Sequence, residues 1–524
     1  MKIIIIKVKE KKALFLSYLF QHLDGIALIP TIMTLEQKKI LSNFNECSLS
    51  FLTQSHKSNE AYLNVALRLL CSQGWLQQSI NNNNVHYELR EKHIDFTEIN
   101  TTYSIAYQLY DQPIDYNVIL QKKKQHINCK SILFKTIEKY INEYQKKQTL
   151  SIFERHVEGA ILGPIIVELA MNNVFFDHNT NWFKKINPSW EDIIKELFIC
   201  SKMIDTKNQL TEYGTFILKR ASSYGVTVSY LPTFRNIKEL IFGNHKLLWS
   251  NYGEIEKHVD RSMNVWGSGG AHNTYFKKVD EIILDLFNLP IEKQPKGFID
   301  IGCGNGKLIE HIFNLIYYQT KRGKQLTEHP LFIVGSDFNY KALQATEKTI
   351  NKADIWAQTA FGDISDPDKL ALKLKKEHNI QLQDLLNVRS FLDHNRIYTH
   401  PKNDHLKQSS STAAFCQKGK RIYNNLVQQN LKEHFEKWYP YLIKYGLLIV
   451  ELHTIPPTHA ANNIGKTAIT AYDATHGFSD QYIIEYNLFL QAALEVGLQP
   501  DPDHEYTFPS REIPIVSINR LIKS

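Results

Sequence analysis

The sequence predicts an α/β protein in which an open, mainly parallel sheet follows a mainly helical, winged-helix-like region. From about residue 290 to the end, short apolar runs alternate with helical patterns, as they do when helices join parallel strands. The last two extended runs have no long helix between them, which predicts an antiparallel pair at one edge of the sheet. Near the N-terminus a helix is followed by a turn and two short extended pieces, the order of a winged helix.

The composition allows a large folded core and excludes several classes of protein. The chain has 524 residues, 43% of them hydrophobic, which is enough for two to four domains. Its six cysteines form no CxxC pair, so neither a disulfide framework nor a zinc ribbon is indicated, and a reducing cytoplasm fits. The net charge of +7 is too diffuse to indicate nucleic acid binding. We find no apolar run of membrane-spanning length, and we expect the opening MKIIIIKVKEKK to be a strand.

Four segments differ in pattern, and we expect them to be separate parts of the fold. They are a helical, winged-helix-like domain at 1–145, a second such lid domain at 146–245, a glycine-rich connecting segment at 246–289, and the sheet domain at 290–524.

The first winged-helix pattern lies between residues 61 and 93. Leu63, Leu67 and Leu70 recur at helical spacing, and Gly74 follows them as a helix C-cap would. The asparagine run 81–84 then predicts a turn between two short strands. The predicted helix carries only Arg68 as a basic residue, so dimerisation or substrate covering is a better interpretation than DNA binding.

The region from about 150 to 232 repeats this plan. The stretch "HVEGAILGP" at 156–164 resembles "HLDGIALIP" at 22–30, and each includes a glycine, Gly159 and Gly25. A second helix and a third helical stretch follow. We therefore expect two related winged-helix-like units.

The sheet domain is read from its alternation of extended and helical patterns. The expected strands lie within 296–301, 330–337, 380–390, 446–454 and 506–523, and the expected helices within 307–319, 340–351, 426–442 and 480–497. In such open sheets ligands bind beyond the carboxyl ends of the strands, so chemistry is sought there.

A glycine loop follows the first of these strands. Asp300, Gly302, Gly304 and Gly306 belong to "DIGCGNG", whose glycines allow a tight turn and close backbone approach to a ligand. The next strand ends in Asp337. Dinucleotide folds usually show GxGxxG, whereas this loop reads GxGxG.

Polar side chains follow two further strands. Asp393 and His394 lie in "NVRSFLDHNRIYTH" (387–400), and Glu451 and His453 close "GLLIVELHT". Three interpretations remain open at this point. In the first, these polar groups are solvated strand ends. In the second, a histidine and a carboxylate form an acid/base pair, either His453 with Glu451 or His394 with Asp393. In the third, Asp393, His453 and Gln481 bind a divalent metal such as Fe(II) or Mn(II).

The glycine loop and the acidic residues that follow it resemble class I S-adenosylmethionine-dependent methyltransferases. The match consists of Asp300 to Gly306, Asp337 and "FGDI" with Asp363 and Ile364. The resemblance implies a Rossmann-like seven-strand sheet with its last strand antiparallel. It also implies that the loop packs against the methionine part of S-adenosylmethionine, Asp337 binds the ribose, and Asp363 with Ile364 meets the adenine.

A narrower resemblance rests on "NVWGSGGAH", "DIGCGNG", "NVRSFLDHNR", "ELHT" and "THGFSDQY". Together they resemble the metal-dependent C-methyltransferases of polyketide synthase loading modules, of the apratoxin type. The resemblance implies C-methylation of a malonyl-type thioester on an acyl carrier protein, assisted by one iron or manganese ion. Carried over to this sequence, the implied metal ligands are His453, Gln481 and Asp393. His476 is a rival for one of these ligand positions. For the mechanism, we hypothesise that His394 or His476 takes the proton and that Arg389 or Arg396 holds the substrate carboxylate.

The alternative is a metal-independent O-methyltransferase that acts on a small molecule with a histidine base and is built as a homodimer. A non-catalytic regulator is the less favoured interpretation, because it would not need polar side chains at the ends of the strands. We expect a cytoplasmic enzyme that binds neither nucleic acid nor membrane.

Overall fold

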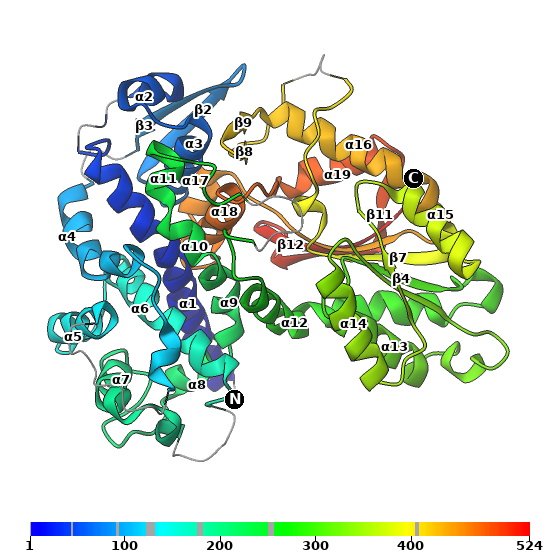
Figure 1. Ribbon diagram of the computed structural model, residues 1–524, viewed down its shortest axis with the longest axis horizontal. Helices are drawn as coiled ribbons and strands as arrows, with labels where there is room; N and C mark the ends of the chain where they lie inside the picture. Colours follow the sequence, from blue (N-terminus) through cyan, green and yellow to red (C-terminus); the bar gives the residue numbers. More distant parts are fainter. Residues whose placement is uncertain are drawn as a thin grey trace. The chain divides into compact units, whose positions relative to one another are not determined.

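The computed structural model describes residues 2–42, 44, 46–90, 94–121, 131–175, 182–249, 256–403 and 408–524, with backbone alone for 2–8 and 271–274 (Figure 1). The chain divides into two compact units. The helical unit comprises Met1–Ala271, Lys418–Arg421 and Pro457–Ser479, and the sheet unit comprises His272–Gln417, Ile422–Pro456 and Asp480–Ser524.

Two long helices cross closely in the helical unit. In α1 (Lys2–Gln37) a Cβ at Gly25 would lie 2.3 Å from His156 Cα, and in α6 (Ile152–Met171) a Cβ at Gly159 would lie 2.3 Å from His22 Cα. The contact is reciprocal. Gly25 of α1 lies against the backbone of His156, three residues before Gly159, and Gly159 of α6 lies against the backbone of His22, three residues before Gly25. The similarity between the sequences at 22–30 and 156–164 therefore corresponds to a pseudo-symmetric crossing of α1 and α6.

The predicted N-terminal strand is wrong, because α1 begins at Lys2. Isoleucine favours strands locally, but extending an established helix costs little once it has nucleated. By length and composition alone, Lys9–Gln37 could also cross a membrane, contrary to our expectation from the apolar runs. Its most apolar window is 56% buried inside the protein, as is usual for a core helix.

The predicted winged-helix elements are present. Helix α2 (Leu49–His56) and α3 (Glu60–Ser72) precede β2 (Leu76–Asn81) and β3 (Asn84–Leu89), which pair with the short β1 (Cys47–Ser48) in the order β1-β3-β2. Asn82 and Asn83 take φ values of 46° and 66°, the left-handed conformation of a two-residue hairpin turn. Arg68 is buried and ion-paired with Asp473 of α18 (Ile469–Gly477), so it does not face outward as a phosphate contact would.

Further helices complete the helical unit. They are α4 (Phe96–Tyr107), α5 (Ile132–Tyr144), α7 (Pro188–Cys200), α8 (Glu212–Leu218), α9 (Ala221–Ser229), α10 (Leu231–Arg235), α11 (Ile237–Phe242) and α17 (Pro457–Ala461). In the second repeat, a single antiparallel bridge between Ile204 and Leu210 stands where the first repeat has its hairpin.

The expected glycine-rich connecting segment is largely a helix, α12 (Arg261–Phe287). A Cβ at Gly267 would lie 2.6 Å from Val226 N, and one at Gly270 would lie 2.1 Å from Ser222 Oγ. Glycines at these positions allow α12 to approach α9 at backbone contact distance. Helix packing thus explains Gly267 and Gly270 of "WGSGG", whereas an added Cβ at Gly269 would meet nothing within 4 Å. The sequence had suggested that this motif covers the cofactor or the substrate.

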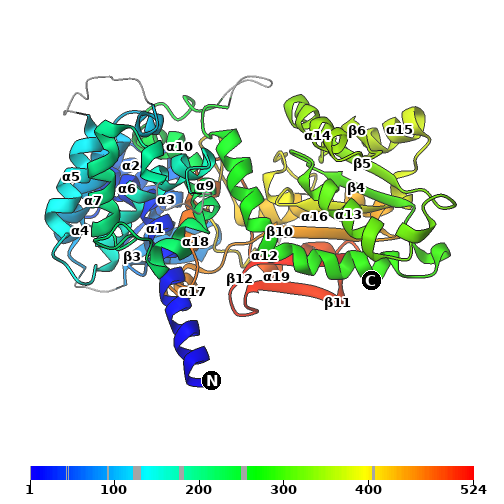
Figure 2. The ribbon, with the colours of Figure 1, turned by 90° about the horizontal axis from the view of Figure 1, so that it is seen from below.

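The sheet unit contains a seven-stranded sheet in the order β11-β12-β10-β7-β4-β5-β6, which runs from bottom to top in Figure 2. The strands are β4 (Gly297–Ile301), β5 (Phe332–Asp337), β6 (Gln358–Phe361), β7 (Leu385–Ser390), β10 (Leu447–Leu452), β11 (Leu498–Pro509) and β12 (Pro514–Lys523). Strand β12 is antiparallel to both neighbours, and the other pairs formed by β4, β5, β6, β7 and β10 are parallel. This confirms the predicted fold class.

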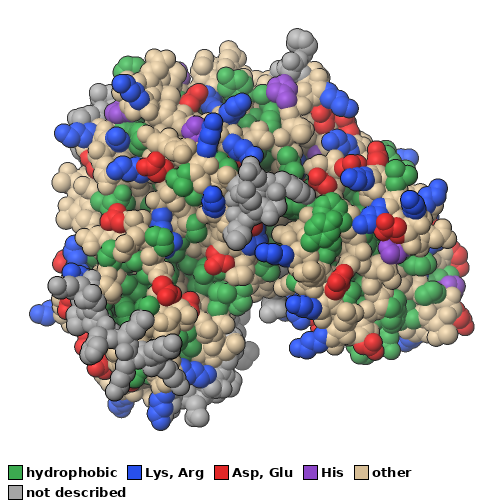
Figure 3. Space-filling view, viewed as in Figure 1, with side chains coloured by type: hydrophobic (Ala, Val, Ile, Leu, Met, Phe, Trp, Pro, Cys, Tyr) green, Lys and Arg blue, Asp and Glu red, His purple; other side chains and the backbone are tan. Residues whose placement is uncertain are grey.

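Helices cover both faces of the sheet. Helices α15 (Pro367–His378), α16 (Asn424–Leu442) and α19 (Tyr486–Leu494) share a buried apolar cluster with Ile299, Leu385 and Ile449 of the sheet. Helix α13 (Lys307–Gln319) packs on the other face, beside α14 (Tyr340–Lys352). Over the sheet unit, side chains of both charges are interspersed on the face drawn in Figure 3.

Two local features differ from the sequence expectations. Helix α19 begins at Tyr486, whereas the sequence predicts a helix from Asp480. Asp480 instead lies in a turn with a positive φ of 58°, residues 481–484 form no regular element, and Glu485 bridges in parallel to Thr454 after β10. A small hairpin of β8 (Phe415–Gln417) and β9 (Lys420–Ile422) was not expected, although its turn, Lys418-Gly419, has two positive φ values of 48° and 83°.

Candidate functional site

The glycine loop lies directly after β4 and has the geometry that its sequence suggested. Gly302, Gly304 and Gly306 have φ values of 79°, 55° and 73°, a left-handed backbone conformation that residues other than glycine rarely adopt. Near Gly304, an added Cβ would meet only the carbonyl oxygen of Gly302, at 3.9 Å, so the backbone is open on that side. The loop is held to β5 because the amides of Gly302 and Cys303 donate to the Ser336 carbonyl at 2.8 and 3.0 Å.

The acidic residues at the ends of neighbouring strands surround this loop. Asp337 accepts hydrogen bonds from the amides of Gly304 (3.2 Å) and Asn339 (2.9 Å). Asp363 accepts from the amide of Ser365 at 2.8 Å. Asp300 is buried. Burial is the larger cause, and the nearby Asp337 the smaller cause, of a rise in the pKa of its carboxyl to about 7. An open glycine backbone beside carboxylates at the ends of β4 and β5 suits a ligand with hydroxyl and amino groups, such as S-adenosylmethionine.

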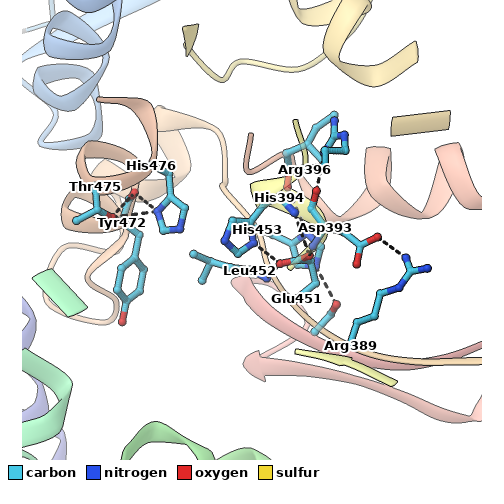
Figure 4. Close-up of polar contacts among 12 residues, drawn as sticks. Arg389, Asp393, His394, Arg396, Glu451, Leu452, His453, Tyr472, Thr475 and His476 are labelled. Atoms are coloured by element: carbon cyan, nitrogen blue, oxygen red, sulfur yellow. Dashed lines mark hydrogen bonds and ion pairs between the residues drawn. The ribbon is translucent and has the colours of Figure 1, made fainter. Parts of the chain in front are cut away.

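An acid/base pair connects the ends of β7 and β10. His394 Nδ1 makes a short hydrogen bond with Glu451 Oε1, and both side chains are buried (Figure 4). The sequence leaves an acid/base pair as one of three interpretations, with His394 and Asp393 or His453 and Glu451 as its members; the pair that forms takes one residue from each. The chain turns at Phe391, a non-glycine residue with φ of 54° whose amide donates to the Val450 carbonyl at 2.7 Å.

Backbone amides hold the Glu451 carboxylate in place. Oε2 accepts from the amides of Asp393 (2.8 Å) and His394 (3.2 Å), and Oε1 accepts from the amide of Leu452 (2.7 Å). The carboxylate in turn favours the tautomer in which His394 Nδ1 carries the proton, so Nε2 is the basic atom.

This pair lies next to the glycine loop. A Cβ at Gly302 would lie 2.9 Å from Leu392 Cδ2, and Leu392 is two residues before His394. Strand β7, which leads to His394, pairs directly with β4, which leads to the loop. The topology therefore brings the glycine loop and the His394–Glu451 pair to one edge of the sheet.

Arg389 and Asp393 face the protein interior. Arg389 is fully buried, donates to Asp393 Oδ1 at 2.7 Å, and lies 4.0 Å from the ring centre of Trp438. The same carboxylate oxygen receives a hydrogen bond from His434 Nε2 at 2.9 Å. In this arrangement Arg389 is not positioned to hold a substrate carboxylate.

His453 directly follows β10, and Gln481 lies in the segment between α18 and α19. His453 Nδ1 donates to the Ile484 carbonyl at 3.2 Å, so its Nε2 accepts from the Ser517 hydroxyl at 2.8 Å. Burial lowers the pKa of His453 to about 3. Gln481 is buried and precedes Tyr482, whose amide donates to the His394 carbonyl at 2.7 Å.

The three predicted metal ligands therefore do not form a donor set in this arrangement. Asp393 Oδ1 is bound by Arg389 and His434, and the lone pair of His453 is taken by Ser517. Among the residues that the structure describes, no group of three or more His, Cys, Asp or Glu side chains could hold a metal ion. The described contacts of these residues therefore do not support an iron or manganese site.

His476 belongs to the helical unit, in α18, whereas His394 and Glu451 belong to the sheet unit. It is buried, and its Nδ1 donates to the Tyr472 carbonyl at 2.6 Å.

Sequence reasoning missed two residues of α16, His434 and Trp438. The signal was present, because Asn430, His434 and Trp438 are spaced by four residues and so share one face of the predicted helix.

Three family models match the chain. Residues 256–519 match the family described as the AprA MT2-like domain, residues 15–78 match the AprA N-terminal domain, and residues 158–244 match the AprA winged helix domain. No curated protein sequence matches the chain.

Solved structures similar to the chain include three methyltransferases. One is the CurJ carbon methyltransferase, with 11% identity over 96% of this chain and 92% of that chain and a TM-score of 0.33. Another is the citrinin polyketide synthase CMeT domain, with 13% identity over 79% and 98% and a TM-score of 0.34. A third is an O-methyltransferase family 2 protein from Planctomyces limnophilus in complex with apigenin, with 9% identity over 97% and 95% and a TM-score of 0.38.

Proposed function

Because the chain belongs to the family of AprA MT2-like methyltransferase domains and is an S-adenosylmethionine-dependent methyltransferase, we propose that it methylates the α-carbon of a malonyl-type acyl group carried as a thioester on an acyl carrier protein. The observation that carries this proposal is the His394–Glu451 pair beside the glycine loop. A carbon nucleophile needs a base, and this pair supplies one at the edge of the sheet where the methyl donor is expected.

In the proposed reaction, His394 Nε2 removes the proton of the α-carbon. The electron pair left on that carbon forms the new bond to the methyl group. S-adenosylmethionine supplies that methyl on a sulfonium, which departs as the neutral thioether. Glu451 stabilises the imidazolium that forms, and its backbone hydrogen bonds keep it from rotating away. A base positioned in this way contributes about 10²–10⁴-fold to a rate.

The proposed mechanism contains no metal step, because the predicted ligands His453 and Asp393 are engaged with protein groups. A cytoplasmic site of action suits the five cysteines described by the structure, which form no disulfide bond with one another.

A second candidate is O-methylation of a small molecule, which the same pair would serve by deprotonating a hydroxyl. The position of the new methyl group distinguishes the two reactions.

The test is incubation of the enzyme and S-adenosylmethionine with malonyl-loaded carrier protein, followed by mass spectrometry of the carrier and of the acid released by hydrolysis. We expect a gain of one methylene on the α-carbon. His394→Ala should abolish it, whereas His400→Ala, which changes an exposed histidine of the same stretch, should not. No gain on the carrier, together with methylation of a phenol, would replace the proposal with O-methylation.

The same assay tests the metal. A sample treated with a chelator should keep its activity. Loss of activity that Fe(II) or Mn(II) restores would contradict the metal-free mechanism.

A further inference from the structure

One face of α16 contacts the loop that carries His394. The face consists of Val427, Asn430, His434 and Trp438, which are spaced by three or four residues and are all buried. The first two bind Arg396: its Nε donates to Asn430 Oδ1 at 2.8 Å, and its Nη2 donates to the Val427 carbonyl at 3.2 Å. Arg396 Nη1 also donates to the Asp393 carbonyl at 2.9 Å. The short helical turn Asp393–Asn395 is thus fastened to α16.

His434 acts on the same turn through a side chain. Its Nε2 donates to Asp393 Oδ1 at 2.9 Å, and burial lowers the pKa of His434 to about 4, so it is neutral at pH 7. Arg389 donates to the same oxygen, while Asp393 Oδ2 has no hydrogen-bond partner among the described residues. The orientation of this carboxylate therefore depends on two donors. The Asp393 amide, in turn, is one of the groups that hold Glu451.

Trp438 contacts a second loop. Its Nε1 donates to the Ile364 carbonyl at 2.7 Å, and its ring lies against the Arg389 guanidinium. Ile364 follows Asp363, which the sequence assigns to the adenine side of the cofactor. A single helix face thus contacts both the base loop and the adenine-side loop.

We propose that this face of α16 positions both halves of the active site: His434 is a positioning residue for the His394–Glu451 pair through Asp393, and Trp438 is a positioning residue for the cofactor through Ile364. The first half rests on the proposed function, since it assumes that His394 is the base. The second half requires only that the protein bind S-adenosylmethionine.

The test compares His434→Leu, which fills the same space without a donor, with His434→Gln, whose amide can replace Nε2. Glu436→Gln, on an exposed position of α16, is the matched control. Three quantities are measured: amide hydrogen exchange in the peptide containing Phe391–Arg396, kcat for the malonyl carrier, and Kd for S-adenosylmethionine by calorimetry.

For His434→Leu we expect faster exchange in that peptide by about tenfold and a fall in kcat of about 10–100-fold, because a charged acceptor loses a buried hydrogen bond. The Kd for S-adenosylmethionine should change less than about twofold, a difference too small to reflect a lost hydrogen bond. His434→Gln should recover most of both losses. A purely structural role would lower the melting temperature and weaken cofactor binding together, without rescue by Gln.

Trp438→Phe should weaken S-adenosylmethionine binding by about fivefold, the value of one ordinary hydrogen bond, while leaving the ring against Arg389. Unchanged exchange and kcat in His434→Leu, or equal impairment of the Leu and Gln variants, would overturn the first half. An unchanged Kd in Trp438→Phe would overturn the second. If the Leu variant does not fold, His434→Met provides the same comparison with a more adaptable side chain.

Exchange and calorimetry do not use the acyl substrate. If the wild-type enzyme does not methylate the malonyl carrier but both of these measurements behave as expected, the proposed substrate fails and the positioning role stands.

Discussion

Glu451→Gln is the sharpest test of the acid/base pair, because the shape of the side chain is kept and only its acceptors change. Four donors converge on the carboxylate: the amides of Asp393 and His394 on Oε2, and the Leu452 amide and His394 Nδ1 on Oε1. The NH₂ group of a glutamine must replace one of the two oxygens. At Oε2 it would leave two backbone donors unpaired, whereas at Oε1 it would leave only the Leu452 amide unpaired.

The second arrangement costs less and changes the chemistry of His394. One buried unpaired donor costs about 1–3 kcal/mol, so the free energy of unfolding should fall by that amount. The glutamine NH₂ then donates to His394 Nδ1, which forces the proton onto Nε2. A histidine protonated at Nε2 cannot accept the substrate proton there, so kcat should fall by about 10²–10⁴-fold.

Urea unfolding and product formation on the carrier measure the two effects separately. Raising the pH should not restore activity, because the lost function is a tautomer and not an incomplete deprotonation. Glu436→Gln is again the control. A Glu451→Gln enzyme that keeps kcat within about threefold of the wild type would refute the reasoning.

Three further predictions concern the cofactor loop and the helical unit. Burial raises the pKa of Asp300 above its ordinary value to about 7, so the folded state binds the proton more tightly, and stability is lost as the pH rises from about 4 through 7. Asp300→Asn should therefore gain stability relative to the wild type at pH 8 compared with pH 5, by about 3 kcal/mol at most, in urea titrations without cofactor; a pH-independent difference would contradict this. Asp337→Asn should weaken S-adenosylmethionine binding by about tenfold or more in calorimetry, since a charged hydrogen bond is worth about 1.5–3 kcal/mol, and wild-type affinity would remove Asp337 from the site. Gly25→Ala should lower the free energy of unfolding by at least about 1–3 kcal/mol, because its Cβ would lie 2.3 Å from His156 Cα, and an unchanged midpoint would mean that the helices can separate at no cost.

Local patterns in the sequence determined most strands and helices of the sheet unit, α15 and the β8-β9 hairpin excepted, and the hairpin at Asn82-Asn83. They also determined the glycine turn after β4, because each depends on contacts or backbone conformations within a few residues. The alternation of strands and helices further determined that the polar residues after β7 and β10 would meet, since parallel neighbours end at the same edge of a sheet.

The partners of those polar residues were decided only by the tertiary structure. The parallel alignment of Val450 with Ser390 and the turn at Phe391 bring His394 to Glu451, and Asp393 turns instead to Arg389 and His434. The role of Gly267 and Gly270 in α12 likewise could not be assigned from sequence, because only the approach of α9 shows why a side chain would not fit at these two positions. The spacing of residues along the chain predicts which residues lie at the carboxyl edge of the sheet. The direction in which a buried side chain points depends on hydrogen-bond donors and packing space in segments that are distant in the sequence.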